Sequence, residues 1–354
     1  MCIRDSLTTG TETGQAMAKR LVPQATACAY FPLDLPWVVG PVIEKIAPDI
    51  VVLTETELWP NFLGHCSRRA IPVVMVNGRV SPRSFRRYSR TSFFWKKVLG
   101  TVREIGVISG VDADRIRALG AAPGNVRVMG NAKYDSLASR VSGEDWSRKA
   151  AQLKMTADSR VLVAGSTHEG EEAVVLDVYR GLLREFPDLR LVLVPRHPER
   201  GAAVRDLAAQ KGHACILMSE IRAGREPQGE LVVVDVIGEL FALYSLATVV
   251  FCGGSLVPKG GQNILEPAAW GKVVFYGPSM EDFADEKALL EEAGAGICVR
   301  DGRELLDRMR EILSDPAERQ RRGAEGRKRV LSSRGAAERY AEMVVKALGL
   351  KAKG

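Results

Sequence analysis

Residues 253–266, G-G-S-L-V-P-K-G-G-Q-N-I-L-E, combine glycines, backbone amides and a carboxylate in an order that suits a nucleotide. They follow an apolar strand-like run and lead into a helix-like one. Glycines after a strand let the backbone approach a ligand, and the first N–H groups of the next helix attract a phosphate. Glu266 can accept hydrogen bonds from ribose hydroxyls. The spacing therefore predicts a phosphate-bearing ligand, such as a sugar nucleotide, at this turn.

Two other strand-like runs in the same half of the chain end in polar residues. R-H-P-E-R at 196–200 places Arg196 directly after residues 191–195. S-T-H-E-G-E-E at 166–172 follows another run, and an anion could rest there. The alternative is a capping sequence, with Ser166 or Thr167 as N-cap and acidic residues in the first helical turn. The four histidines lack the spacing of metal ligands, so we expect no metal site.

Candidate catalytic residues lie in the first half. T-E-T-E-L-W-P-N at 54–61 places Glu55 and Glu57 where a strand gives way to a helix, the edge at which α/β folds bind ligands. The alternative is a solvated position in the first turn of that helix. Lys133, in G-N-A-K-Y-D at 130–135, follows the last strand of this half. Its ammonium could stabilise a departing phosphate, although a surface lysine is the simpler reading.

Residues 79–97 mix cations with aromatic rings, a combination suited to anionic headgroups beside acyl chains. Nucleic acid could bind the same mixture, and a solvated helix face is a third alternative. The cations are Arg79, Arg83, Arg86, Arg87, Arg90, Lys96 and Lys97, and the aromatic residues are Phe85, Tyr88, Phe93, Phe94 and Trp95.

Length and composition indicate a two-domain enzyme. The chain has 354 residues, 46% of them hydrophobic, and a net charge of +7 that favours anionic partners. Six cysteines without a C-x-x-C pair favour a reducing, cytoplasmic setting, and no apolar run reaches 18 residues. Short apolar runs between helix-like stretches predict two doubly wound parallel α/β domains. The expected runs are 50–53, 72–76, 105–108, 126–129, 161–164, 189–194, 214–218, 231–234, 249–252, 273–276 and 296–299.

The expected boundaries are an N-terminal domain at 1–140, a linker at 141–158, a C-terminal domain at 159–333, and a helix and tail at 334–354. The motifs quoted above, with G-R-V-S-P-R-S at 78–84 and V-P-R-H-P-E-R at 194–200, resemble those of the 3-deoxy-D-manno-octulosonic acid (Kdo) transferases of lipopolysaccharide synthesis. The resemblance covers nearly everything from Leu7 onward, with six blocks in the same order.

This resemblance implies a GT-B glycosyltransferase with two Rossmann-like domains facing a central cleft. The C-terminal domain would hold CMP-Kdo, and the N-terminal domain would receive the lipid A precursor at the cytoplasmic face of the bacterial inner membrane. Transfer would be inverting, without metal or cofactor, and nucleic acid would not be a partner. Glu55 and Lys133 correspond to transition-state stabilisers. The positions that correspond to CMP-binding residues are Pro195, Arg196, Ile237, Gly238, Glu239, Asn263, Ile264, Leu265 and Glu266.

One motif of the family has no counterpart. The family begins with a membrane anchor, a strand and an H-x-V-S-V-G-E-like turn whose glutamate is the general base, and residues 1–6 contain no glutamate. We therefore expect a lost upstream segment, an exposed sheet edge and impaired activity of the chain as printed. Two rival functions remain open. One is a GT-B transferase or epimerase that uses a UDP-sugar, and the other is a non-catalytic binder of anionic lipid or nucleic acid.

Overall fold

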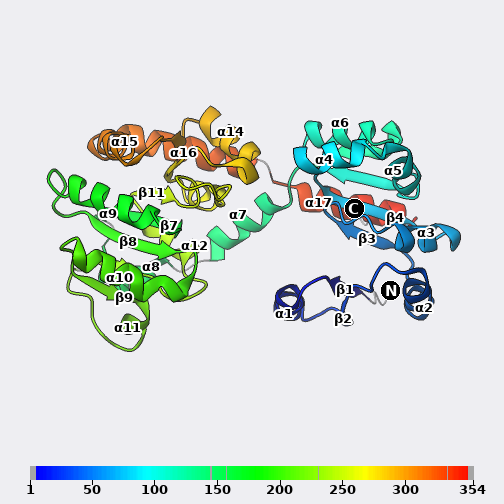
Figure 1. Cartoon of the computed structure of the whole chain (residues 1–354), viewed down its shortest axis with the longest axis horizontal. Helices are drawn as coiled ribbons and strands as arrows, with labels where there is room; N and C mark the ends of the chain where they lie inside the picture. The colour runs from blue at the N-terminus through cyan, green and yellow to red at the C-terminus, as the bar shows by residue number, and fades with distance from the viewer. Residues whose placement is uncertain (1–4, 144–145, 157, 230, 333, 350–354) are drawn as a thin grey trace. The chain divides into compact units, whose positions relative to one another are not determined.

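The computed structural model describes residues 5–143, 146–156, 158–229, 231–332 and 334–349, and it contains two compact α/β units (Figure 1). Unit 1 comprises Met1–Ala132 and Gly335–Gly354, and unit 2 comprises Lys133–Arg334. The boundary therefore falls before Lys133 and not at residue 140, and the last segment of the chain belongs to unit 1. Residues 141–158, expected as a linker, contribute helices to unit 2.

Unit 1 contains a two-stranded parallel sheet, β1-β2, and a four-stranded parallel sheet of order β3-β4-β5-β6. The strands are β1 (Ser6–Thr9), β2 (Ala27–Tyr30), β3 (Val51–Thr54), β4 (Val73–Gly78), β5 (Glu104–Val107) and β6 (Val126–Val128). The helices are α1 (Glu12–Leu21), α2 (Pro36–Ile46), α3 (Pro60–Arg68), α4 (Pro82–Ser89), α5 (Ser92–Leu99), α6 (Gly110–Ala118) and α17 (Ala336–Ala347).

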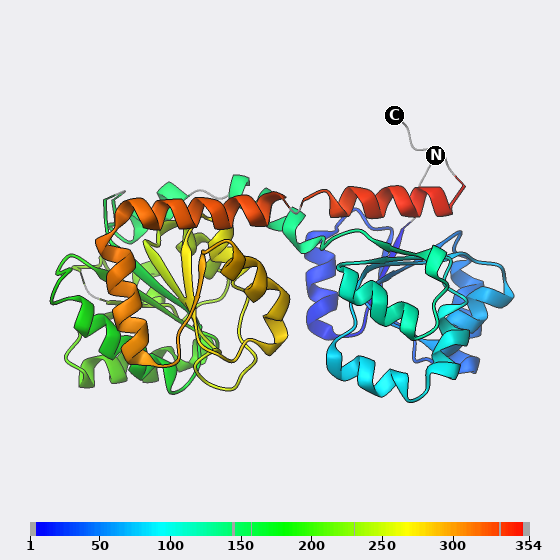
Figure 2. The ribbon, with the colours of Figure 1, turned by 90° about the horizontal axis from the view of Figure 1, so that it is seen from above.

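The last helix, α17, covers one face of the four-stranded sheet against β4 and β5 (Figure 2). Tyr340 and Met343 pack there against Val74, and all three are buried. Gly106 of β5 makes room for the Tyr340 ring, because an added Cβ would lie 2.5 Å from that ring. The Tyr340 hydroxyl donates to the Gly130 carbonyl at 2.8 Å. The core of unit 1 is thus completed by residues more than 200 positions further along the chain.

Unit 2 is built on a seven-stranded parallel sheet of order β13-β12-β11-β7-β8-β10-β9. The strands are β7 (Val161–Thr167), β8 (Arg190–Pro195), β9 (Cys215–Leu217), β10 (Leu231–Val233), β11 (Val249–Cys252), β12 (Val273–Tyr276) and β13 (Gly296–Cys298). The helices are α7 (Lys133–Gly143), α8 (Trp146–Gln152), α9 (Glu171–Leu182), α10 (Gly201–Gln210), α11 (Met218–Arg222), α12 (Leu240–Leu246), α13 (Leu265–Ala269), α14 (Ala284–Glu292), α15 (Gly302–Ser314) and α16 (Pro316–Ser332).

The strand order of unit 2 reverses at β7, which lies between β8 and β11. In chain order, β8, β9 and β10 lie on one side of β7, and β11, β12 and β13 lie on the other. Such a switch point opens a crevice at the carboxyl ends of the two strands, where ligands bind in open α/β sheets. The predicted α/β fold class with parallel sheets is confirmed, and every apolar run predicted as a strand coincides with one. β2 was not predicted.

Lys272, just before β12, has a partly buried ammonium group that we expect to weaken the fold at neutral pH. Burial, followed by the repulsion of Arg319, lowers the pKa of Lys272 to about 8. Because the unfolded state keeps the ordinary, higher value, the cost of this partly buried charge is fully present below pH 8 and disappears as the pH rises toward 10.5.

Lys272→Met should therefore raise the free energy of unfolding by about 1–3 kcal/mol at pH 7 and by much less at pH 10. Urea denaturation at the two pH values measures the difference. Lys328→Met, at a lysine of α16 whose side chain is 76% exposed, is the control and should change little. Equal stability of the Lys272→Met variant and the wild type at pH 7 would show that the ammonium carries no cost.

Candidate functional site

The carboxyl edge of the unit 2 sheet brings the predicted loops together. Cys252 at the end of β11 pairs with Gly165 of β7, and the Gly253 N–H donates to the Gly165 carbonyl at 2.8 Å. The Arg196 N–H, directly after β8, donates to the Thr167 carbonyl at 2.9 Å. An added Cβ at Gly253 would lie 2.5 Å from the Thr167 Cα, so only glycine allows this approach. The glycine turn and Arg196 therefore occupy one edge.

The buried carboxylate of Glu171 organises the glycine turn. It accepts hydrogen bonds from the backbone N–H groups of Gly254 at 2.7 Å, Ser255 at 3.0 Å and Leu256 at 2.9 Å. It also accepts one from His168 N–H at 2.9 Å, and its own side chain is fully buried. These turn amides are therefore occupied by an internal anion and are not open to a phosphate. The sequence reasoning missed this role.

The helix after β7 begins later than the capping interpretation predicted. Gly170 is the N-cap of α9, and Thr167 still belongs to β7, so the prediction of Ser166 or Thr167 as N-cap is wrong. Ser166 has a φ of 56°, a left-handed conformation that is unfavourable for a residue with a side chain. The acidic residues of the first turn, Glu171 and Glu172, are both buried.

Four basic side chains gather beside this turn. The rings of His168 and His197 lie 5.9 Å apart, edge to face. Burial lowers the pKa of His168; Glu171 opposes this shift, and the charges of His197, Lys259 and Arg196 add to it. The lowered pKa favours the neutral form of His168, and the exposed Arg196 and Lys259 add positive charge to the cluster. An anionic ligand suits such a surface.

Glu266 lies in α13 at the end of the same loop and forms an ion pair with Arg140 of α7. The Arg140 Nη1 lies 3.1 Å from Glu266 Oε1, and the guanidinium carbon lies 3.7 Å from the centre of the Phe241 ring. Asn263 accepts a hydrogen bond from the Leu265 N–H at 3.1 Å. The side chains of Ile264 and Leu265 are in the core, so only their backbone is available to a ligand.

Glu239, a predicted CMP-binding position, has partners within the protein. Its buried carboxylate pairs with Lys149 of α8 and Arg222 of α11. Burial raises its pKa, but the hydrogen bonds from Lys149 and Arg222 outweigh burial and lower it overall. Neighbouring Ile237 is 86% exposed, and Gly238 has a φ of 90°. The loop therefore presents Ile237 and the Gly238 backbone to solvent, while Glu239 fixes its base.

Glu55 lies at the carboxyl end of β3 in unit 1, with its carboxylate exposed. Its φ of 62° is left-handed, and its N–H donates to the Val76 carbonyl at 2.9 Å. Strained non-glycine residues at the ends of strands are concentrated at functional sites. Because α3 begins at Pro60, Glu55 and Glu57 are not in its first turn, and that alternative is wrong. Lys133 is the exposed first residue of α7 in unit 2.

The basic and aromatic stretch forms α4 and α5. Phe85, Tyr88 and Trp95 pack against the core of unit 1 and anchor the two helices. Phe93 and Phe94 instead remain 73% and 40% exposed. The cations from Arg83 to Lys97 are exposed beside them. The structure thus presents two apolar rings within a basic surface.

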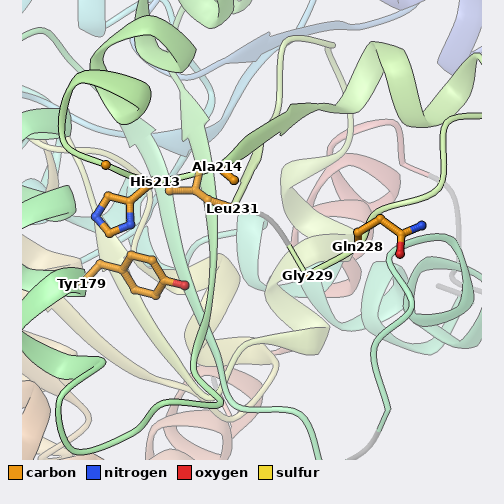
Figure 3. Close-up of a pocket in the computed structure, with 7 residues that line it drawn as sticks. Tyr179, His213, Ala214, Gln228, Gly229 and Leu231 are labelled. Atoms are coloured by element: carbon orange, nitrogen blue, oxygen red, sulfur yellow. The ribbon is translucent and has the colours of Figure 1, made fainter.

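A hollow of about 310 Å³ lies at the opposite end of the unit 2 sheet, before β9 and β10 (Figure 3). The rings of Tyr179 and His213 face it, 5.3 Å apart. None of the predicted site residues lines this hollow. Parallel sheets bind ligands at the carboxyl edge, which is the other end of the sheet. Within the described residues, no cluster of three or more His, Cys, Asp or Glu could hold a metal ion. In that same part of the chain, no helix is long and apolar enough to span a membrane.

Comparison with known proteins identifies the class first. A crystal structure of UDP-N-acetylglucosamine 2-epimerase matches with a TM-score of 0.67 and 14% identity, covering 100% of this chain and 90% of that one. Such a likeness shows the fold, which is the GT-B arrangement of two Rossmann-like units.

Sequence comparison then gives the family. Residues 3–136 match the family model described as 3-Deoxy-D-manno-octulosonic-acid transferase (kdotransferase). The 3-deoxy-D-manno-octulosonic acid transferase of Haemophilus influenzae is 32% identical over 96% of this chain and 79% of its own length. That of Chlamydophila psittaci is 31% identical over 88% and 71%. The chain belongs to the 3-deoxy-D-manno-octulosonic acid transferase family of GT-B glycosyltransferases, as the motifs predicted.

Proposed function

We propose that this chain transfers Kdo from CMP-Kdo to the lipid A precursor, lipid IVA. The observation that carries the proposal is the carboxyl edge of unit 2, where exposed cations, a ribose-compatible carboxylate and a glycine turn occur together in a member of this family. A nucleotide joined to an acidic sugar carries the negative charge that Arg196 and Lys259 suit. Pro195, at the end of β8, fixes the backbone before Arg196.

In the proposed donor complex, each loop contacts a different part of CMP-Kdo. Glu266 accepts from the ribose hydroxyls, and Asn263 with the backbone of Ile264 and Leu265 lines the nucleotide. Ile237 and Gly238 contact the base, while Glu239 supports their loop from below through its paired cations. Arg196 and Lys259 neutralise the phosphate. Every one of these residues belongs to unit 2.

The proposed reaction is a single inverting displacement without a metal ion. The acceptor hydroxyl oxygen bonds to the anomeric carbon of Kdo while the bond from that carbon to the phosphate oxygen breaks, and CMP leaves. The family resemblance assigns the departing hydroxyl proton to the glutamate of an H-x-V-S-V-G-E turn. Lys133 offsets negative charge on the leaving phosphate. Glu55 stabilises the oxocarbenium-like centre.

Acceptor binding is proposed for unit 1. The exposed Phe93 and Phe94 suit acyl chains, and the surrounding cations of α4 and α5 suit the phosphates of the precursor and of an anionic bilayer. The chain would accordingly work at the cytoplasmic face of the bacterial inner membrane. Nucleic acid is not part of this proposal.

Thermal-shift titration tests the donor, and a transfer assay tests the reaction. CMP should raise the melting temperature by several degrees at a hundred times its Kd, whereas UDP and UDP-N-acetylglucosamine should not. Stabilisation by the UDP compounds alone would favour the rival UDP-sugar enzyme. Salt-sensitive binding of nucleic acid without any nucleotide response would favour the non-catalytic binder. Transfer of Kdo from CMP-Kdo to lipid IVA is then measured directly.

A further inference from the structure

Arg140 occupies the space between two loops of the proposed donor site. It lies on α7, which packs against α13, and its guanidinium lies over the ring of Phe241 on α12. Phe241 follows the loop of Ile237 and Gly238 by three residues, and α13 contains Glu266. One side chain therefore contacts the elements that follow both proposed nucleotide loops.

The contact geometry fixes the Glu266 carboxylate. The Phe241 ring supports one face of the planar guanidinium at 3.7 Å, and the Nη1 atom reaches Glu266 Oε1 at 3.1 Å. Stacking favours a guanidinium plane parallel to the ring, so its N–H groups have a set direction. The Glu266 side chain remains 22% exposed. One carboxylate oxygen of Glu266 is thus bound by Arg140, while part of the carboxylate stays accessible to a ligand.

The same helix carries Lys133 at its first position, seven residues before Arg140. Seven residues are close to two helical turns, so the two side chains leave the helix on one side, about 10 Å apart along its axis. A contact that anchors Arg140 also sets the position of Lys133 relative to Glu266. The helix α7 thereby sets the distance between Glu266, which is proposed to bind the ribose, and Lys133, which is proposed to act on the leaving group.

We propose that Arg140 is a positioning residue of the donor site. It orients Glu266 toward the ribose and fixes the position of α7 relative to Glu266. This inference rests on the proposed function of the site. Arg140 itself touches protein groups only in this arrangement and is not a catalytic residue. Its removal should weaken binding through the ribose hydroxyls in particular, because the carboxylate that accepts from them loses its support.

The test compares CMP with 2′,3′-dideoxycytidine monophosphate by isothermal titration calorimetry. Hydrogen bonds to a carboxylate should make wild-type binding of CMP about 10- to 100-fold tighter than that of the analogue. Arg140→Met should weaken CMP about tenfold and leave the analogue's Kd nearly unchanged. Arg140→Lys keeps the charge without the planar stack and should give an intermediate ratio; it also serves if Arg140→Met does not fold.

Arg160 provides a matched control. It pairs with Asp188 at 2.7 Å and its guanidinium lies 5.6 Å from the Phe186 ring, but it precedes β7 at the opposite edge. Arg160→Met should leave both Kd values unchanged. Equal weakening of both nucleotides by Arg140→Met, or no weakening, would overturn the positioning role. Failure of the wild type to bind CMP, or to distinguish the two nucleotides, would instead reject the proposed donor site, and with it the need for Arg140.

Discussion

Lys133→Met is expected to lower kcat for Kdo transfer by about 10²- to 10³-fold while the Kd for CMP changes less than threefold. The ammonium is proposed to act on the negative charge that develops as CMP departs, and that charge is largest in the transition state. Methionine has a similar length and shape but no charge. Single-turnover transfer to lipid IVA measures the chemical step, and calorimetry with CMP measures ground-state binding.

The comparison variant for this experiment is Lys154→Met. Lys154 is an exposed lysine of unit 2 whose ammonium lies 2.6 Å from Glu226, away from the carboxyl edge of the sheet. Its removal should leave kcat within twofold of wild type. If Lys133→Met lost affinity for CMP in proportion to its loss of kcat, the lysine would bind the donor uniformly and would not stabilise the transition state.

Glu171→Ala is expected to reduce the free energy of unfolding by about 3–5 kcal/mol. The substitution removes the acceptor of four backbone N–H groups at once, those of His168, Gly254, Ser255 and Leu256. It also leaves a cavity where a fully buried side chain stood. Urea denaturation followed by circular dichroism measures the loss, and CMP binding should fall with it because the glycine turn loses its anchor.

Glu169→Ala is the control, since that neighbouring side chain is 87% exposed and its ion pair with Arg200 lies in solvent. Its effect should stay within about 0.5 kcal/mol. Glu171→Gln keeps the volume but turns an amide donor toward backbone donors, so it should fall between the two. Similar stability of Glu171→Ala and Glu169→Ala would mean that the buried carboxylate does not hold the turn.

The sequence predicted the parallel strands well because strands buried on both faces appear as continuous apolar runs. It also predicted which loops share an edge, since polar residues after parallel strands end on the same side of a sheet. β2, with the sequence A-C-A-Y, is short and mostly exposed, so it carries no such signal. The boundary at residue 140 was misplaced because α7 is polar in sequence yet packs against unit 2.

The partners of the site residues could not be predicted in the same way. Arg140 and Glu266 are separated by 126 positions, and Glu171 and Gly254 by 83. No local pattern records which distant cation or amide a carboxylate will meet. The motif made Glu239 a candidate ligand residue, but it gave no sign of the buried ion pairs with Lys149 and Arg222. Family resemblance identifies which residues belong to the candidate site. Tertiary contacts are needed to tell which of them face a ligand and which support a loop.

The way α17 closes unit 1 has a consequence for synthesis on the ribosome. The sheet face beneath Tyr340 and Met343 stays uncovered until α17 has been translated, which follows the strands of that sheet by about 200 positions or more. Unit 2 contains all its own strands and helices within one uninterrupted segment and can finish folding earlier. The four-stranded sheet of unit 1 is therefore made before unit 2 but covered after it, and an apolar face that stays exposed during synthesis is prone to aggregation.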